Sequence, residues 1–583
     1  MLTRSIRITL ILLWLFCSVS QAGSLSHIQL IESETTTERT QQLLQSALVW
    51  GWVKYYHPAA NAGKLDIDAE LVRLLSQQWA ADKQDMTTAI TDWLTALPDW
   101  PDDVQPSADA WQLYQAQSMQ ILPLPLEWHN ALAALANKPV KNPYYFDYTR
   151  WIGNYQQQNE AGYPDFSAEP QQVWLALFRY WNVIHYFFPY HDQMDVAWTS
   201  RFEELVPVFA QVKDEVSYRY ALLRLAAAVQ DGHAIIRHNN WMLIPGHFFL
   251  PVQFLILDGK VLVQNSYRIE GNPLQPGDEV LAFQQQPTSA WLDSVLPIIP
   301  ASGDPMLSSY LRAFLQRTNE AEVRMTIRRG EKISDVTVPS FGYSQLTATP
   351  LSRSIVLPKH QWLDGQVAYL KIYAMSRKEF SEAYALYQTA DALLLDLRGY
   401  PNDSGTFSAL MRHLVKGRSA ALGFVRPSKG QPGSFHRFYD SKTGSWWPFG
   451  RAETRPVIAL ISARSMSQSE TNLMLLQLYQ NSLLVGSNTA GANGDITFVT
   501  VPGDYQLYFS GLGVYYPDDT PMQRYGVLPD VLVQQTVADL RIGQDTQLNK
   551  AVSIIASGQN IQELRSSQVD KIQALSRKRP PLE

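Results

Sequence analysis

Several features are scarce in this 583-residue chain, and each scarcity excludes a class of site or function. Cys17 is the only cysteine, so the chain cannot form an internal disulfide framework or a cysteine-based zinc site. Charged residues make up 17%, and the formal net charge of -6 gives no electrostatic support for nucleic-acid binding. After residue 22, no run is long and apolar enough to span a bilayer. A hydrophobic content of 46% suits a large globular protein of several domains.

Three common catalytic signatures are also missing. There is no H-E-x-x-H zinc motif, no glycine-rich phosphate loop and no G-x-S-x-G nucleophile turn. His185 and His191 lie in an aromatic stretch without cysteines or paired carboxylates at zinc spacing. We therefore expect neither a metal nor a cofactor.

Residues 1–22 have the pattern of a bacterial secretory signal. Arg4 and Arg7 precede the apolar run from Ile8 to Phe16, and Ser20-Gln21-Ala22 provides a small-residue cleavage site before Gly23. The alternative, an uncleaved membrane anchor, is disfavoured because the run is short. A mature chain without cysteine suits an oxidising compartment. The sequence predicts a periplasmic or secreted protein without stable membrane insertion.

Two aromatic-rich helical patterns repeat at a fixed distance. The distance from Trp50 to Trp181 is 131 residues, and the same distance separates Pro58 from Pro189. This repeat predicts a duplicated helical unit, with copies at 23–165 and 166–247. We expect the aromatic faces to form helix–helix core. The second copy alone continues into Asp231-Gly232-His233.

The next segment, 248–345, is mostly strand-like. Leu274 to Leu281 has the pattern L-x-P-G-D-x-V-L, which resembles a PDZ domain, and such domains bind an extended peptide at a sheet edge. Gly246 to Phe249 is a poor match to a carboxylate-binding loop, so capture of a free C-terminus is not predicted. The Ser-rich, basic end of the chain predicts a flexible tail over 556–583.

Ser467 stands between an apolar strand pattern, Val457 to Ile461, and an apolar helical pattern that begins near Leu473. Unpaired N–H groups and the positive end of a helix dipole favour a developing oxyanion there, which suits a nucleophile. The alternative is structural, because Ser467-x-x-Glu470 also matches a capping box.

Four segments in order resemble the C-terminal processing (tail-specific) peptidases and the tricorn core protease. They are Ala392 to Gly399, ending in D-L-R-G; Ser467 to Glu470, S-x-S-E; Val485 to Gly491, V-G-x-x-T-x-G; and Gly526 to Val531, G-V-x-P-D-V. The resemblance implies an α+β multidomain protein with duplicated helical parts, a PDZ-like β-domain and a ClpP/crotonase-like α/β catalytic domain at 350–555. It also implies that Ser467 is the nucleophile.

The general base must differ from that of the processing peptidases, which use a lysine. That lysine follows the T-x-G glycine, but here Gly491 is followed by alanine, and no lysine occurs between Lys442 and Lys550. The chain therefore resembles the tricorn-type serine–histidine branch, which implies that His233 is the base. In that branch a supporting glutamate stands where this chain has Gln523. Glutamine cannot offset an imidazolium charge, so the third catalytic member stays open.

The oxyanion hole is expected to use the backbone N–H of Gln468, the residue after the nucleophile. The resemblance implies a second donor from the turn after D-L-R-G, where Asn402 is the best candidate. Glu470 and Gln523 are expected to support the site.

Together these features predict an exported serine-type endopeptidase that hydrolyses peptides or unfolded proteins. The alternative is a non-catalytic peptide-binding protein or PDZ-type adaptor on the same fold. The two differ in whether His233 and Ser467 come within hydrogen-bonding distance. No nucleic-acid partner is expected, and the sequence does not predict the oligomeric state.

Overall fold

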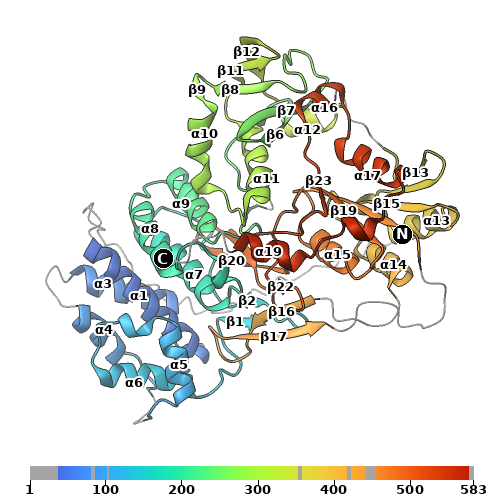
Figure 1. The fold of residues 1–583 in the computed structure, drawn as a ribbon. Coiled ribbons are helices and arrows are strands. Elements are labelled where there is room, and N and C mark those ends of the chain that lie inside the picture. The colour runs from blue at the N-terminus through green and yellow to red at the C-terminus, as the bar shows by residue number, and fades with distance from the viewer. Residues whose placement is uncertain are drawn as a thin grey trace, which may run out of the picture.

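The computed structural model describes residues 37–80, 86–100, 104–239, 241–351, 357–415, 422–440 and 453–576. The predicted signal peptide lies outside these ranges. Within them, no helix is long and apolar enough to cross a membrane. Helices and sheets are arranged in several parts, so the chain is a multidomain α+β protein (Figure 1).

The N-terminal half is helical and contains two series of three helices. The first series is α1 (Thr37–Tyr56), α3 (Ile67–Ala80) and α4 (Met86–Thr95). The second is α7 (Pro170–Phe187), α8 (Trp198–Ala210) and α9 (Glu215–Ala228). Between them lie α5 (Ala108–Ala116), α6 (Leu126–Ala134) and a hairpin of β1 (Phe146–Tyr148) and β2 (Tyr155–Gln157). The two series follow one another at the spacing of the sequence repeat.

Equivalent residues of the two series make equivalent contacts. The Trp50 indole donates to the carbonyl of Ile67 at 2.8 Å, and the Trp181 indole donates to the carbonyl of Trp198 at 3.1 Å. Trp181 and Trp198 lie 131 residues after Trp50 and Ile67, which is the spacing of the sequence repeat. Burying an indole N–H requires such an acceptor, and both series of helices supply one at the equivalent position.

Helices α1 and α7 also meet through equivalent positions. Gly51 lies against Asn182, so that a Cβ on Gly51 would be 1.8 Å from the Asn182 side-chain oxygen. The rings of Tyr55 and Tyr186 are edge-on at 4.8 Å. Like positions that face each other are typical of a two-fold interface. We propose on this basis that the two units are copies of one ancestor.

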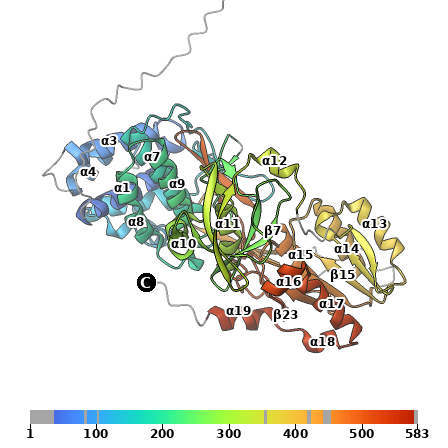
Figure 2. The same cartoon turned by 90° about the horizontal axis from the view of Figure 1, so that it is seen from above.

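The segment 248–345 is mainly strand, in agreement with its sequence pattern. Its antiparallel sheet has the order β12-β11-β8-β7-β6, with β9 beside β8. The strands are β6 (Val252–Leu257), β7 (Lys260–Ser266), β8 (Glu279–Phe283), β9 (Gln286–Pro287), β11 (Glu322–Arg329) and β12 (Lys332–Pro339). Helices α10 (Thr288–Val295) and α11 (Asp304–Leu315) complete it. In Figure 2 this part lies between the helical units and the C-terminal layers. Its likeness to a PDZ domain stays a prediction.

The C-terminal part is built on a sheet with the order β13-β14-β15-β18-β19-β23, parallel from β14 onward. The strands are β13 (His360–Leu363), β14 (Val367–Leu370), β15 (Ala392–Asp396), β18 (Val457–Ile461), β19 (Ser482–Gly486) and β23 (Val531–Leu532). Every residue of β15, β18 and β19 is buried, because helices cover both faces of a parallel sheet.

Alternate residues of these strands pack against different helices. Ala459 and Ile461 join the core on the side of α13 (Arg377–Leu386), α14 (Ser404–Leu414) and α15 (Gln468–Leu476). Ile458 and Leu460 face α17 (Thr546–Ala556) and α18 (Ile561–Leu564). The short α16 (Val537–Ile542) precedes α17.

A small sheet joins the helical half to the C-terminal part. Its order is β20-β21-β3-β4, from β20 (Ile496–Val501), β21 (Tyr505–Ser510), β3 (Ile236–His238) and β4 (Trp241–Met242). A three-stranded sheet lies nearby, with β16 (Leu422–Pro427), β17 (Phe435–Asp440) and β22 (Gly513–Tyr515). Pairing of β3 with β21 brings the segment after His233 onto the C-terminal part.

The prediction of a flexible tail over 556–583 is wrong as far as residue 576. This segment forms α18 and α19 (Gln568–Ser576), and Ile572 is 1% exposed within the core. The Gln568 side chain hydrogen-bonds both the N–H and the carbonyl of Leu528, at 2.9 and 2.6 Å. The serines suggested disorder, but the Ser567 hydroxyl accepts the N–H of Asp570 at the start of α19. Residues 577–583 lie outside the described part.

The close approach at Gly51 gives a test of the helix pairing. Gly51→Ala should destabilise the protein by about 1–3 kcal/mol, because the added methyl overlaps Asn182 and forces α1 and α7 apart. Differential scanning calorimetry would show a lower Tm. Gly342→Ala is the matched control, because a Cβ there has its nearest neighbour at 3.7 Å and the backbone φ is -66°. An equal Tm for the two variants would contradict this packing.

Candidate active site

Ser467 occupies a strained turn between β18 and α15. Its φ is 55° and ψ is -115°, which is unfavourable for a residue with a side chain. Two neighbouring serines are committed elsewhere: the hydroxyls of Ser465 and Ser469 donate to the carbonyls of Leu397 and Gly399, both at 2.7 Å. The half-buried Ser467 side chain makes no capping hydrogen bond to α15. Of the three hydroxyls, that of Ser467 is the one left for chemistry.

The capping box predicted for Ser467-x-x-Glu470 is formed by the Glu470 side chain and by main-chain groups. The Glu470 carboxylate accepts the N–H of Ser467 at 3.0 Å, and the Glu470 N–H donates to the Ser467 carbonyl at 2.8 Å. The capping box therefore forms without the serine hydroxyl, and capping does not compete with a nucleophilic role.

Glu470 also fastens the loop opposite the nucleophile. Its side chain is fully buried, and it accepts hydrogen bonds from the Thr489 hydroxyl at 2.6 Å, the Gly491 N–H at 2.7 Å and the Ala492 N–H at 3.1 Å. Burial raises the pKa of Glu470 to about 7, while its hydrogen-bond donors act in the opposite direction. The carboxylate joins the V-G-x-x-T-x-G segment to the turn that carries Ser467.

His233 is buried and is held by a serine–aspartate pair. Its Nδ1 lies 2.8 Å from the Ser510 hydroxyl oxygen, and that hydroxyl donates to Asp231 at 2.9 Å. Because Ser510 uses its proton on Asp231, its oxygen accepts the N–H of Nδ1, which leaves Nε2 as the unprotonated ring nitrogen. Burial lowers the pKa of His233, and the negative charges of Asp231 and Asp495 partly oppose this shift.

Asp231 is the centre of this hydrogen-bond network. Besides the Ser510 hydroxyl, it accepts the Ser510 N–H at 2.6 Å, the His233 N–H at 3.2 Å and the Gln523 amide at 3.0 Å. The Gln523 carbonyl oxygen in turn accepts the N–H of Asn493 at 3.2 Å. Asp231 is the first residue of the D-G-H pattern, but the sequence alone did not predict a catalytic role for it. Ser510 had no sequence signal, because only the pairing of β3 with β21 brings it to the histidine.

Ala492 contacts both Ser467 and Gly232, the residue before His233. The Ser467 N–H donates to the carbonyl of Ala492 at 2.9 Å, and a Cβ on Gly232 would lie 2.6 Å from the Ala492 Cβ. Glycine at 232 is therefore what allows the histidine segment to approach this loop. No hydrogen bond links Ser467 to His233 among the residues that the structure describes.

One of the two expected oxyanion donors is available in this structure. The N–H of Gln468 is the first of α15 and has no acceptor within the described ranges. The N–H of Asn402, in contrast, donates to the carbonyl of Tyr373 at 2.9 Å, and its residue is exposed. This bond removes the donor that the sequence-based assignment required. The Tyr400 N–H, two residues earlier in the turn, has no acceptor among the described residues and is the better candidate.

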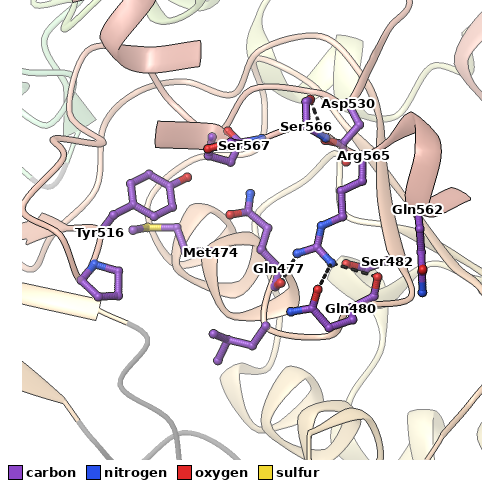
Figure 3. Close-up of a pocket in the computed structure, with 13 residues that line it drawn as sticks. Met474, Gln477, Gln480, Ser482, Tyr516, Asp530, Gln562, Arg565, Ser566 and Ser567 are labelled. Atoms are coloured by element: carbon purple, nitrogen blue, oxygen red, sulfur yellow. Dashed lines mark hydrogen bonds between the residues drawn. The ribbon is translucent and has the colours of Figure 1, made fainter. Parts of the chain in front are cut away.

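The opposite end of α15 is held by the C-terminal segment. Arg565 donates to the carbonyls of Tyr479 at 3.1 Å, Gln480 at 2.9 Å and Gln477, where a cation also complements the helix dipole. Arg565 lines a pocket of about 640 Å³ shown in Figure 3. None of the predicted site residues lines this pocket, so it is distinct from the nucleophile turn.

No group of three or more histidine, cysteine or acidic side chains suited to a metal occurs in the described part of the chain. His185 instead stacks on Trp181 at 4.8 Å, and burial lowers its pKa to about 3. A neutral histidine within an aromatic core is structural.

The hydrogen bonds of the Glu470 carboxylate, here called the glutamate clamp, give a direct test of the site. Glu470→Gln should lower both activity and stability, the latter by about 1–3 kcal/mol, because an amide nitrogen would face N–H donors of the loop. Glu379→Gln is the matched control, since Glu379 closes a half-buried capping box with Ser376 at the start of α13. Peptide hydrolysis and Tm should be measured for both. Full activity of Glu470→Gln would show that the clamp does not position the nucleophile.

Comparisons with known proteins concern mainly the C-terminal part of the chain. Residues 366–533 match the model of peptidase family S41. The carboxy-terminal-processing protease of Bartonella bacilliformis is 24% identical over 249 residues, which cover 40% of this chain and 55% of the relative. The chain thus matches about half the length of this curated relative.

Two solved structures share the fold. Mature CPAF complexed with lactacystin is 13% identical with a TM-score of 0.51, covering 67% of this chain and 98% of that one. Another structure of mature CPAF is 12% identical with a TM-score of 0.51, covering 66% and 96%. At this identity the likeness concerns the fold alone. Taken with the ordered motifs, the family match indicates a peptidase S41 domain at residues 366–533.

Proposed function

We propose that this protein is an exported serine endopeptidase that cleaves peptides or unfolded proteins with Ser467 as nucleophile and His233 as general base. The observation that carries the proposal is the different use of three neighbouring serines: Ser465 and Ser469 are bound to strand-end carbonyls, and Ser467 presents a hydroxyl from a strained turn at a helix N-terminus. Strain and an uncommitted hydroxyl in one place are features of a reactive centre.

The reaction divides into two acyl-transfer steps. The Ser467 oxygen attacks the peptide carbonyl carbon while its proton passes to Nε2 of His233, and the N–H groups of Gln468 and Tyr400 stabilise the oxyanion. The histidine then returns the proton to the leaving amine, and an acyl-enzyme forms. Water, deprotonated by the same nitrogen, releases the acid and restores the serine. Substrate binding has to bring the Ser467 hydroxyl to Nε2, a hydrogen bond that often tightens only in the complex.

The Asp231–Ser510 pair supplies the third catalytic function. An imidazolium forms on His233 during each step, and a nearby carboxylate stabilises it and fixes the ring. Here Asp231 supplies the carboxylate, and the Ser510 hydroxyl lies between it and the His233 ring. The Gln523 amide donates a hydrogen bond to the same carboxylate. Glutamine at 523 is thus compatible with catalysis, because its amide holds the aspartate that carries the charge.

A second candidate function is a non-catalytic peptide-binding protein. It is favoured by the absence of a Ser467–His233 hydrogen bond among the described residues and by the loss of the family's lysine. It predicts that purified protein binds unfolded polypeptides without cleaving them, whereas the first proposal predicts fragments.

The nucleophile is tested by substitution within the serine cluster. Ser467→Ala should abolish cleavage of casein or a peptide library, yet change stability by less than about 1 kcal/mol, because the hydroxyl caps nothing. Ser469→Ala should retain measurable activity, since that serine only binds the Gly399 carbonyl. Fragments are detected by mass spectrometry and folding by circular dichroism. Wild-type cleavage by Ser467→Ala would reject the assignment.

The base is tested by pH dependence. Because burial lowers the pKa of His233, kcat/KM should fall on acidification with a midpoint below about 6.5, the ordinary pKa of a histidine. Asp231→Asn removes a charge that favours the imidazolium, so it should lower kcat by about 100-fold or more and move that midpoint lower still.

Asp214→Asn is the control for this substitution. It caps the exposed start of α9, where asparagine serves equally well, and should leave the profile unchanged. A profile with no acidic limb, or an unchanged kcat for Asp231→Asn, would remove the histidine mechanism.

A further inference from the structure

Strand β20 forms one edge of the small sheet that carries the segment after His233. Among the described strands it pairs with β21 alone. Alternate residues of such a strand direct their main-chain groups to opposite sides. The carbonyl of Asp495 accepts the N–H of Gly511 on the β21 side, whereas side chains bind the N–H and carbonyl of Thr500 from the other side. Every second residue before Thr500 therefore faces the open edge.

The Gln157 side chain shows how this edge binds an amide. Its carboxamide oxygen accepts the Thr500 N–H at 2.6 Å, and its nitrogen donates to the Thr500 carbonyl at 3.0 Å. A carboxamide carries the donor and the acceptor of a peptide unit, so Gln157 occupies the edge as a neighbouring strand would. The next groups along the edge are unused. The N–H and carbonyl of Phe498 and the carbonyl of Ile496 have no partner within the described ranges.

The unused part of the edge lines a groove beside the β1–β2 hairpin (Figure 1). Strand β2 is fastened to β20 by Gln157 and by the Thr497 hydroxyl, which donates to the Tyr155 carbonyl at 2.5 Å. Between the two strands lies a cavity of about 370 Å³, lined by Ile496, Phe498 and residues of β2. Ligand sites have volumes of about 300–1,000 Å³, so the groove is large enough to hold part of an extended chain.

The groove carries no free charge along β20. Residues 496–501 include no charged residue, proline or glycine, and the side chains of Ile496 and Phe498 are exposed. Proteins normally protect an edge of this composition with charges or proline, because it pairs readily with another strand. Glu160, the acidic residue among those that line the cavity, is buried and paired with Lys54. The groove therefore favours a neutral main chain with apolar side chains over a charged ligand.

The groove begins next to the proposed base. Ile496 stands opposite Ser510 in the register of β20 with β21, and the Ser510 hydroxyl hydrogen-bonds His233. Opposite residues of antiparallel strands have Cα atoms about 4.5–5.5 Å apart. A chain bound along β20 would therefore run past the histidine side of the proposed active site.

We propose that the edge of β20, at Ile496 and Phe498, binds an extended segment of an unfolded polypeptide as an added strand. The main chain of the segment pairs with Phe498, and its apolar side chains lie on those of Ile496 and Phe498. This inference rests on the proposed function and deepens it, because it names an unfolded chain in extended conformation as the substrate.

The test measures binding by fluorescence anisotropy with Ser467→Ala, so that nothing is cleaved. The probe is a labelled, uncharged peptide of alternating apolar and polar residues. Two further versions carry N-methyl groups on either the apolar or the polar residues. Methylation of one set should weaken binding at least about tenfold, because it removes a hydrogen bond at the edge, and the other set should retain the affinity. One Kd for all three peptides, or equal losses for both sets, would overturn the proposal.

The position of the groove is tested by substitution. Phe498→Lys should weaken binding of the unmodified peptide at least about tenfold, because a charge on an edge strand opposes pairing. Trp241→Lys is the matched control, because Trp241 is exposed on β4 at the opposite edge of the same sheet, and it should keep the Kd. Circular dichroism checks that both variants fold. An unchanged Kd for Phe498→Lys, or an equal loss in both variants, would overturn the groove.

Other outcomes separate this inference from the peptidase proposal. A dimer that disappears in Phe498→Lys, detected by analytical ultracentrifugation without any peptide binding, would identify a second copy as the occupant and overturn the proposal. Peptide binding by Ser467→Ala without cleavage by the wild type would support the groove and reject the catalytic function. Equal cleavage by the wild type and Phe498→Lys, with no binding at the edge, would leave the peptidase proposal standing and overturn the groove.

Discussion

The buried carboxylate of Glu470 is the interaction on which the proposed site depends. It receives the N–H of the nucleophile and three donors from the facing loop, so it fixes the turn at Ser467 against Ala492. An unsatisfied buried carboxylate would be strongly unfavourable, and this requirement forces the two segments into one arrangement. The same main-chain capping leaves the serine hydroxyl uncommitted.

The rest of the molecule positions a base against this turn. Equivalent aromatic contacts hold α1 to α7, and the second helical unit ends at His233. Pairing of β3 with β21 then places Ser510 beside the imidazole and Asp231 behind it. At the far end of α15, Arg565 binds the carbonyls of Gln477, Tyr479 and Gln480, which follow the helix. The helix that presents Ser467 is thus held at both ends by segments far away in sequence.

Charge is distributed unevenly around the proposed reaction centre. Negative charge from Asp231 lies behind the base, where it favours the imidazolium formed during proton transfer.

The sequence by itself indicated the buried strand before Ser467 and the helix after it, because hydrophobic periodicity is local, and its ordered motifs marked Ser467 as the candidate nucleophile. Tertiary structure alone decided the rest. In the folded chain the Asn402 N–H donates to the Tyr373 carbonyl, and the serine-rich segment packs into the core through Ile572. Ser510 also hydrogen-bonds a histidine 277 positions away. Hydrogen bonds between such distant residues leave no pattern in the chain, because they depend on which strands pair and not on neighbouring residues.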